Sequence, residues 1–282
     1  MGTIAITGAS GFVGGHLRAA LAGDGHEIRP LSVRSGVAPD AVDGTDAVIH
    51  LAGESVSGRW TAAKRERILA SRRDGTHAVV DAIGAATERP SVLVCASAVA
   101  VVADRGDEVL AEDSGPGAGL LSTVCQVWEA EAARVADHGV RAVSVRFGII
   151  LARDAEAFRR LLTPAKLGLG GPMGGGRQWW PWVHIDDIVG IVRAALEDER
   201  FTGAVNATAP GAERQREVAK ALGRAVHRPA SLPAPAFALK LLLGGFAEEL
   251  LGSRRVQPAR ATELGYAFRH PELDGALADL TG

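Results

Sequence analysis

Short apolar runs alternate with longer amphipathic stretches through the first half of the chain. Four runs predict buried strands, at residues 3–7, 47–51, 92–96 and 142–147. Between them, a 3.6-residue apolar period predicts helices at residues 12–22, 62–85 and 122–137. Strands that alternate with helices in this way are typical of βαβ units, so the pattern predicts a parallel sheet.

One further strand is predicted at residues 27–33, but it contains Pro30. Proline cannot donate to a sheet ladder, so this strand fits only at an edge or an irregularity. Residues 36–45 contain only Gly, Val, Ala, Pro, Asp and Thr. A strand there would be short or missing.

The pattern changes after residue 147. Residues 167–177 are rich in glycine, residues 179–182 place three tryptophans around one proline, and residues 229–235 are rich in proline. We therefore predict an α/β protein with a doubly wound parallel sheet, or Rossmann domain, at residues 1–165. A smaller, mostly helical substrate-side lobe follows at 166–282, with segments around 183–210 returning to the sheet.

Composition narrows the range of partners. The 282 residues include 31 Lys and Arg and 33 Asp and Glu, for a formal net charge of -2, so the basic excess of a nucleic-acid-binding protein is missing. The most apolar stretches, 92–102 and 237–243, are far shorter than the roughly 20 residues that span a bilayer. We expect no membrane partner and a small-molecule substrate.

The first residues of the sequence and the two cysteines indicate the cellular compartment. The first residues already resemble a strand and carry no basic region, so no signal peptide is expected. Cys95 and Cys125 form neither a metal-ligand spacing nor a disulfide framework, so we predict no metal site and a reducing, cytoplasmic environment. Proteins of this class often form homodimers, although no segment marks an interface.

The segment from Thr7 to Gly14, Thr-Gly-Ala-Ser-Gly-Phe-Val-Gly, lies between a predicted strand and a predicted helix. This placement is the one that a dinucleotide site requires, since glycines let the backbone approach the pyrophosphate at a helix N-terminus. A purely structural turn is the alternative interpretation. The predicted cofactor contacts from this motif are Gly8, Ser10, Gly11, Phe12, Val13 and Gly14.

The end of the second strand favours NADP(H). Sites specific for NAD place an acidic residue there, on the ribose hydroxyls, whereas this chain has Ser32 and Arg34. A hydroxyl and a guanidinium suit a 2'-phosphate. The alternative is that Arg34 is a solvated surface arginine.

Together with the glycine motif, further stretches resemble the extended short-chain dehydrogenases/reductases, in particular the epimerase-like branch (NAD-dependent epimerase/dehydratase) with its own C-terminal domain. These stretches are 46–54, 58–60, 71–72, 75–76, 104–108, 128–129, 167–172, 176–179, 182–187 and 205–210. They run over nearly the whole chain. The resemblance therefore implies a Rossmann fold and a nicotinamide cofactor.

The resemblance also implies further cofactor contacts. It places three residues along the adenosine side of the cofactor: Leu51, Ala52 and Gly53. It implies that Arg72 faces the cofactor or the active-site floor and that Ile150 lies near the nicotinamide. The alternative for Arg72 is an ion pair with Asp74 or Glu66 on the helix surface.

The usual catalytic pair of this superfamily, Tyr-x-x-x-Lys, is missing. The only tyrosine, Tyr266, lies near the C-terminus, and the expected helix has Cys125 or Val124 in the tyrosine position. The epimerase-like branch commonly shares this loss. A different group must therefore move the proton that accompanies hydride transfer.

Several residues could take over proton transfer. Ser97 matches the serine that relatives place at the reacting oxygen, although it could simply cap a loop. Cys125 could donate from its thiol or be a small buried apolar residue. His184 has a pKa suited to proton transfer, but its context suggests an orienting role at the lobe junction. Glu129 and the charged residues 104–108 are further candidates, the latter more simply a solvated turn.

The residues that could form a substrate wall are apolar. Val101, Val102 and the tryptophans at 179, 180 and 182 would favour an apolar or aromatic carbonyl compound, but inter-lobe packing explains the tryptophans equally well. We predict an atypical NADP-dependent oxidoreductase. A non-catalytic NADP-binding regulatory protein and a nucleotide-sugar epimerase are the alternatives, and the missing acid/base pair argues most directly against the epimerase.

Overall fold

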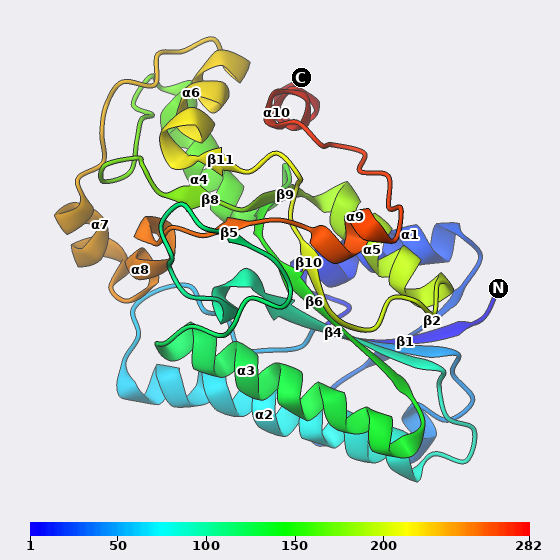
Figure 1. Cartoon of the computed structure of the whole chain (residues 1–282). Helices are drawn as coiled ribbons and strands as arrows, with labels where there is room; N and C mark the ends of the chain where they lie inside the picture. Colours follow the sequence, from blue (N-terminus) through cyan, green and yellow to red (C-terminus); the bar gives the residue numbers. More distant parts are fainter.

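A six-stranded parallel sheet forms the centre of the molecule (Figure 1). The computed structural model describes residues 1–282, with the side chains of residues 1–241, 244–245, 247 and 249–282. Along the sheet the strand order is β10-β6-β4-β3-β1-β2. These strands are β1 (Thr3–Thr7), β2 (Glu27–Leu31), β3 (Ala47–His50), β4 (Val92–Ala98), β6 (Arg141–Phe147) and β10 (Gly203–Ala207). The predicted doubly wound Rossmann fold is confirmed.

The strand order reverses beside β1. From β1 the chain first moves outward to β2, and it then returns to the other side of β1 to build β3, β4, β6 and β10. Ligands of doubly wound sheets bind in the crevice at such a switch point, outside the carboxyl ends of the strands. The topology thus directs attention to the ends of β1 and β3.

Two expectations for the β2 edge are confirmed. Pro30 lies within β2, which is the outermost strand and pairs only with β1, so its missing N–H breaks no interior ladder. Residues 36–45 form no sheet strand. They contain only the short 3-10 helix η1 (Pro39–Ala41).

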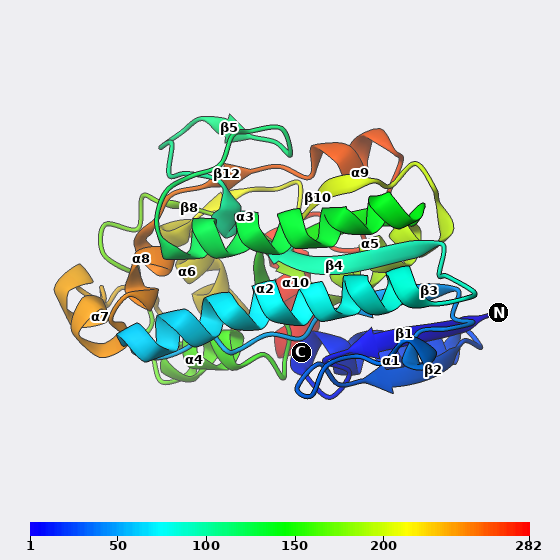
Figure 2. The ribbon, with the colours of Figure 1, turned by 90° about the horizontal axis from the view of Figure 1, so that it is seen from below.

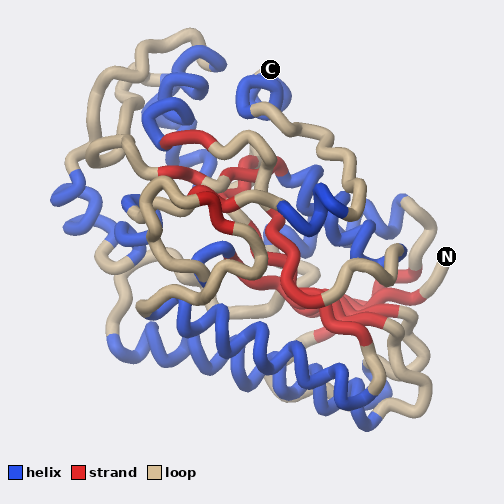
Figure 3. Tube along the Cα trace, viewed as in Figure 1, coloured by secondary structure: helices blue, strands red, loops and turns tan.

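Helices cover both faces of the sheet (Figure 1, Figure 3). One layer holds α2 (Ala62–Ala85) and α3 (Leu120–Ala133), and the other holds α1 (Phe12–Gly23) and α5 (Ile185–Glu197). In the view from below, α2 and α3 lie side by side across one face (Figure 2). Alternate strand residues fill the two cores, with Ile4, Ile6 and Ile49 on the α1 side and Ala5, Val48 and Leu93 on the α2 side. Burial of both faces explains why the central strands are almost continuously apolar.

The remaining elements lie mostly beyond the carboxyl ends of the strands, where α6 and α10 lie close together (Figure 1). The helices are α4 (Glu156–Lys166), α6 (Gln215–Ala225), α7 (Ala236–Leu243), α8 (Phe246–Leu251), α9 (Ala259–Glu263), α10 (Leu273–Thr281), η2 (Val99–Val101) and η3 (Arg134–His138). The short strands pair as β5 (Val109–Leu110) with β12 (Arg255–Val256), β7 (Ile149–Leu151) with β9 (Trp182–His184), and β8 (Trp179–Trp180) with β11 (Glu213–Arg214). These pairs connect distant segments of the chain, and α9 packs beside β10.

Gly14 provides a test of the close contact between α1 and the turn after β1. A Cβ at Gly14 would overlap the Gly8 carbonyl oxygen, whereas a Cβ at Gly15, the next residue of α1, would meet nothing within 4 Å. We expect Gly14→Ala to lower the free energy of unfolding by roughly 2 kcal/mol or more through overpacking. Gly15→Ala should raise it by about 0.5–1 kcal/mol, because alanine favours a helix. Urea unfolding of both variants measures the difference, and equal stabilities would contradict the close contact.

Candidate active site

The turn after β1 leaves the N-terminus of α1 open. Gly8 has φ +69°, a conformation that favours glycine, and the Gly11 N–H donates to the Gly8 carbonyl at 2.8 Å. Gly11 is the N-cap residue, no side chain caps the helix, and its first turn contains no acidic residue. The first N–H groups and the positive end of the helix dipole therefore remain available to an anion.

A cleft of about 480 Å³ lies at the carboxyl ends of β1, β3, β4 and β6. Many of the predicted cofactor residues line it, namely Gly8, Gly11, Phe12, Val13, Gly14, Leu51, Gly53 and Arg72. The glycine turn after β1 and the residues that follow β3 therefore line the same cleft.

Other predicted cofactor residues do not line this cleft. Ser10 is exposed on the glycine turn, and Ser32 and Arg34 are exposed just after β2. Ile150 lies half-buried in β7, where it pairs with Val183. Ala52, half-buried after β3, is also absent from the lining. The cofactor contacts assigned to all of these residues, including those that line the cleft, stay predictions.

Val124, one of the two residues predicted in the tyrosine position, also lines the cleft. Sequence reasoning missed other lining residues, which lie at or after the carboxyl ends of the strands or belong to α3. They are Glu54, Ser55, Val56, Ala96, Ala98, Ala100, Leu121, Trp128, Phe147 and Gly148. The rule that ligands bind at carboxyl ends could have indicated those at the ends of β3, β4 and β6. Leu121 and Trp128 on α3 carry no comparable signal, because their inward direction depends on how that helix packs.

His50, at the end of β3, anchors the β1 end of the cleft. Thr7 Oγ1 accepts the N–H groups of Leu51 (3.1 Å) and Ala52 (3.2 Å), so its own hydroxyl donates to His50 Nδ1 at 2.7 Å. The other ring nitrogen of His50, Nε2, then carries the proton and donates to Thr76 Oγ1 at 3.0 Å. Burial, and secondarily Arg72, lowers the pKa of His50 to about 4. A neutral imidazole therefore ties β1, β3 and α2 together.

Ser97, near the end of β4, has a specific partner. Its hydroxyl donates to Glu129 Oε1 at 2.6 Å, and Arg146 binds both carboxylate oxygens of Glu129 at 2.8 Å, through Nε and Nη2. The third Arg146 nitrogen, Nη1, donates to the Glu112 carbonyl at 2.9 Å. Ser97 lines the cleft, whereas Glu129 stands behind it. A proton at Ser97 thus has a short route to a carboxylate.

Cys125 lines the cleft but is a neutral thiol near physiological pH. The side chain is 4% exposed. Burial, and secondarily the charge of Glu129, raises its pKa to about 11. Both a buried apolar character and contact with a ligand are compatible with this position.

His184 does not line this cleft. It is the N-cap residue of α5, and its Nδ1 accepts the Asp186 N–H at 3.2 Å. Its ring packs on His270 at 3.8 Å, and its Nε2 lies 3.4 Å from Asp279 Oδ2. One ligand atom each from His184, His270 and Asp279 lies within 4.8 Å of the others. Because Nδ1 is an acceptor, the neutral His184 ring keeps its proton on Nε2, which does not suit metal ligation.

The tryptophans act in packing rather than as a cleft wall. Trp180 and Trp182 are each 1% exposed and donate to the carbonyls of Leu250 (3.0 Å) and Gly211 (2.8 Å). Trp179 contacts the guanidinium groups of Arg214 and Arg255, each 4.5 Å from its ring. None of them lines the cleft, so the interpretation of the indoles as a substrate wall is wrong.

Other sequence candidates also lie elsewhere. Val101 and Val102 are buried against Leu110, and the lining residues of that segment are Ala98 and Ala100. The Tyr266 hydroxyl donates to Asp187 Oδ1 at 3.1 Å, outside the cleft lining. Asp107, in the charged loop 104–108, accepts from Trp179 Nε1 and Arg214, both at 2.8 Å. That loop fastens the C-terminal lobe and does not reach the cleft.

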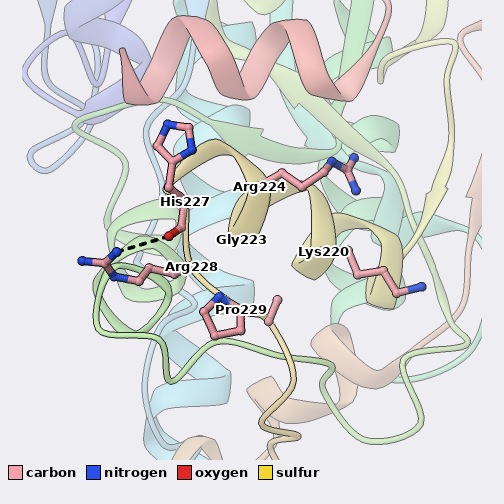
Figure 4. A pocket seen from close by; sticks show the side chains of 7 residues that line it. Lys220, Gly223, Arg224, His227, Arg228 and Pro229 are labelled. Atoms are coloured by element: carbon pink, nitrogen blue, oxygen red, sulfur yellow. Dashed lines mark hydrogen bonds between the residues drawn. The ribbon is translucent and has the colours of Figure 1, made fainter.

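A second hollow, of about 600 Å³, lies beside the C-terminal end of α6 (Figure 4). Its cationic groups point in different directions, with Lys220 and Arg224 on one side and Arg228 on the other. Arg224 donates to Asp274 at 2.7 Å and Lys220 to Glu217 at 3.1 Å. Because these cations do not converge and two are already paired, the cleft at the sheet edge is the stronger candidate.

Comparison with known proteins agrees with this geometry. The family model described as "NAD dependent epimerase/dehydratase family" matches residues 4–207, and a domain of unknown function, DUF1731, matches residues 234–280. The chain belongs to the NAD dependent epimerase/dehydratase family. The resemblance inferred from the motifs is thereby confirmed, including the separate C-terminal domain.

Relatives of this family match along nearly the full chain. The Arabidopsis thaliana chloroplastic homolog of epimerase family protein SDR39U1 is 36% identical, covering 98% of this chain and 85% of its own. Epimerase family protein YfhF of Bacillus subtilis is 33% identical, covering 98% and 97%. A crystal structure of human SDR39U1 (isoform 2) with NADPH has a TM-score of 0.93 at 32% identity, covering 99% of both chains. A nucleoside-diphosphate sugar epimerase from Corynebacterium glutamicum has a TM-score of 0.81 at 30% identity, with 99% of this chain and 58% of that chain covered.

No helix among the described residues combines the length and apolarity needed to cross a bilayer.

His50 provides a test of the β1–β3–α2 connection through the pH dependence of stability. Below pH 6.5 the unfolded chain protonates this histidine, whereas the native state resists protonation down to about pH 4. Stability from the neutral ring is therefore present above pH 6.5 and lost as the pH falls toward 4, in total about 3 kcal/mol at about 1.4 kcal/mol per pKa unit. The free energy of unfolding is measured with urea at pH 7 and at pH 4.5. Between these two pH values it should fall markedly less for His50→Gln than for wild type. The exposed His227→Gln variant should show the pH dependence of wild type, and an unchanged slope in His50→Gln would refute the assignment.

Proposed function

We propose that this protein is an atypical NADP(H)-dependent oxidoreductase that acts on a small, weakly polar carbonyl compound. The observation that carries the proposal is the cleft itself, which is lined by the open N-terminus of α1 and by Ser97, with Glu129 hydrogen-bonded behind the serine. Family membership supports a nicotinamide cofactor. Because a structure of human SDR39U1 contains NADPH, NADP(H) is the favoured form.

The residues present fit a dinucleotide. The absence of a side chain at Gly14 and the uncapped helix leave a backbone cradle into which a pyrophosphate can come close. Gly8 and Gly11 would line this cradle, and Leu51, Ala52 and Gly53 would lie along the adenosine. No acidic residue stands at the end of β2, where Ser32 and Arg34 are exposed and free to meet a 2'-phosphate. The cofactor, when bound, supplies or accepts the hydride.

Ser97 and Glu129 would move the accompanying proton. In alcohol oxidation the substrate hydroxyl donates to Ser97 Oγ while the Ser97 proton passes to Glu129, 2.6 Å away. In reduction the same proton returns through Ser97 to the oxygen formed from the carbonyl. Arg146 holds both oxygens of Glu129 in place for this transfer. The pair would therefore replace the acid/base function of the absent tyrosine and lysine.

The lining around Ser97 supports a weakly polar substrate. Ala98, Ala100, Leu121 and Val124 present small or apolar side chains to the cleft. The Cys125 thiol, which the sequence also suggests as a proton donor, is neutral there, and Ser97 has the better-defined route for a proton. Sugar-nucleotide epimerisation is disfavoured because a polar sugar would find few hydrogen-bonding partners on this wall.

The test of the proposal combines binding and turnover. Calorimetry should show tighter binding of NADPH than of NADH, and NADPH absorbance should fall with at least one member of a panel of aldehydes, ketones and enones. Ser97→Ala should lower kcat roughly 100-fold or more, as expected for loss of a proton-transfer group, with NADPH affinity unchanged. Ser144→Ala, the same change at a buried serine on β6 outside the cleft lining, is the control. Tight NADPH binding without turnover of any compound would instead favour a non-catalytic regulatory protein.

Arg34 provides a separate test of cofactor preference. Arg34→Ala should bind NADPH about 10- to 100-fold more weakly than wild type, because it lacks a charge-assisted contact to the 2'-phosphate. Its affinity for NADH should be unchanged. Arg89→Ala removes the same charge just before β4, at the amino-terminal end of that strand and away from the cleft lining, and should leave both affinities unchanged. If Arg34→Ala keeps the preference of wild type for NADPH, the role given to Arg34 is wrong.

A further inference from the structure

Arg72 on α2 is a buried cation without a carboxylate partner. Its side chain lines the cleft, and the residue is 9% exposed. One guanidinium nitrogen, Nη1, donates to the Glu54 carbonyl and to Ser71 Oγ, the latter at 3.1 Å. Both are neutral acceptors, so the charge of Arg72 is not compensated by a bonded anion.

The nearby carboxylates are committed elsewhere. The Glu54 carboxylate forms ion pairs with Lys64 Nζ at 2.9 Å and with Arg67 Nε at 3.5 Å. Of the two partners considered for Arg72 from the sequence, Asp74 pairs with Arg73 at 2.7 Å, and Glu66 is exposed and forms no ion pair with Arg72. Among the described residues that line the cleft, Arg72 is the single cation, and Glu54 is the single acid.

The guanidinium is also held in position. Its carbon lies 5.0 Å from the centre of the Trp128 ring, a cation–π contact that fixes one face. On another side, a Cβ at Gly53 would stand 2.7 Å from the Arg72 Cζ, so the space beside the guanidinium exists only because residue 53 is glycine. The Arg72 guanidinium is therefore held in one orientation at the wall of the cleft.

One N–H donor of the Arg72 guanidinium lacks an acceptor. Arg72 Nε is buried and has no hydrogen-bond partner among the described residues. Buried donors are nearly always paired, so the protein leaves the Arg72 guanidinium incompletely satisfied, and the part of the side chain that lines the cleft is expected to meet an acceptor on a ligand. Arginine presents its N–H groups to carboxylate and phosphate oxygens with matching geometry.

We propose that Arg72 is the receptor for an oxyanionic group of the molecule bound in the cleft. The group is either a phosphate oxygen of the cofactor or a carboxylate of the substrate, and the identity of that molecule rests on the proposed function. In the second case the substrate would be a carbonyl compound whose single charged part is one acidic group, with the weakly polar remainder against the apolar lining of the cleft. Arg72 would then hold that acidic group and so orient the carbonyl in the cleft that Ser97 also lines.

The experiment compares Arg72→Met with Arg73→Met. Methionine keeps an unbranched side chain beside Trp128 but removes the charge and the N–H donors of the guanidinium. Arg73→Met is the control, because Arg73 is the next residue of α2, is exposed and pairs with Asp74. Binding is measured by calorimetry with NADPH and with inorganic pyrophosphate. It is then measured with two 2-oxo acids, pyruvate and benzoylformate, on the NADPH-loaded protein, or on the free protein if NADPH does not bind.

Each arm gives a distinct outcome. A loss of NADPH and pyrophosphate affinity of about 10- to 100-fold in Arg72→Met, with Arg73→Met unchanged, assigns the oxyanion to the cofactor. Unchanged NADPH affinity with a similar loss of 2-oxo acid binding assigns it to the substrate. If wild type binds no NADPH but binds pyrophosphate or a 2-oxo acid through Arg72, the proposed function fails while the anion site stands. Equal binding of every probe by wild type and Arg72→Met, or wild type binding none of them, overturns the proposal.

Thermal unfolding separates this role from a structural one. Arg72→Met also removes the hydrogen bonds to Glu54 and Ser71, so its Tm without ligand does not decide between the two roles. The deciding measurement is the rise in Tm that a bound anion causes, which should be present in wild type and lost in Arg72→Met. Gly53→Ala serves as the second variant, because it leaves Arg72 in the chain and only displaces its guanidinium. Anion affinity retained in a folded Gly53→Ala protein, together with equal rises in Tm of wild type and Arg72→Met, would overturn the assignment.

Discussion

The contact between α1 and the turn after β1 is the constraint on which the rest of the site depends. Only a residue without a side chain at position 14 lets the helix lie against the Gly8 carbonyl. That approach aims the uncapped N-terminus of α1 at the crevice where the strand order reverses. Thr7 and His50 then secure the same corner, since their hydrogen bonds join β1, β3 and α2.

Two arginines near the cleft have opposite surroundings. Arg146 is neutralised by a bidentate contact with Glu129, and this contact positions the carboxylate behind Ser97. Arg72 has only neutral acceptors and a Trp128 ring, and its Nε has no partner among the described residues. We infer that the first arginine supports proton transfer and that the second binds an anion, without the tyrosine and lysine typical of the superfamily.

Much of the fold could be predicted from the sequence because its elements are defined locally. The helix predicted at 62–85 matches α2, and the doubly wound sheet with Pro30 in an edge strand follows from apolar runs and proline chemistry. The tryptophan cluster could not be interpreted in the same way. A run of indoles next to glycines suits either a ligand wall or a packing core, and only the burial of Trp180 and Trp182 decides between them.

The sequence by itself determined the glycine turn, the parallel sheet, the family and the absence of the usual acid/base pair. These depend on residue type, spacing and short-range periodicity, which are complete in the linear chain. The tertiary structure alone decided that Ser97, Glu129 and Arg146 form one group, because they come from β4, α3 and β6 and meet only when α3 packs on the sheet. It also decided the direction of Arg72: neighbouring residues on one helix face different surroundings, so Arg73 meets Asp74 at the surface while Arg72 turns to the cleft.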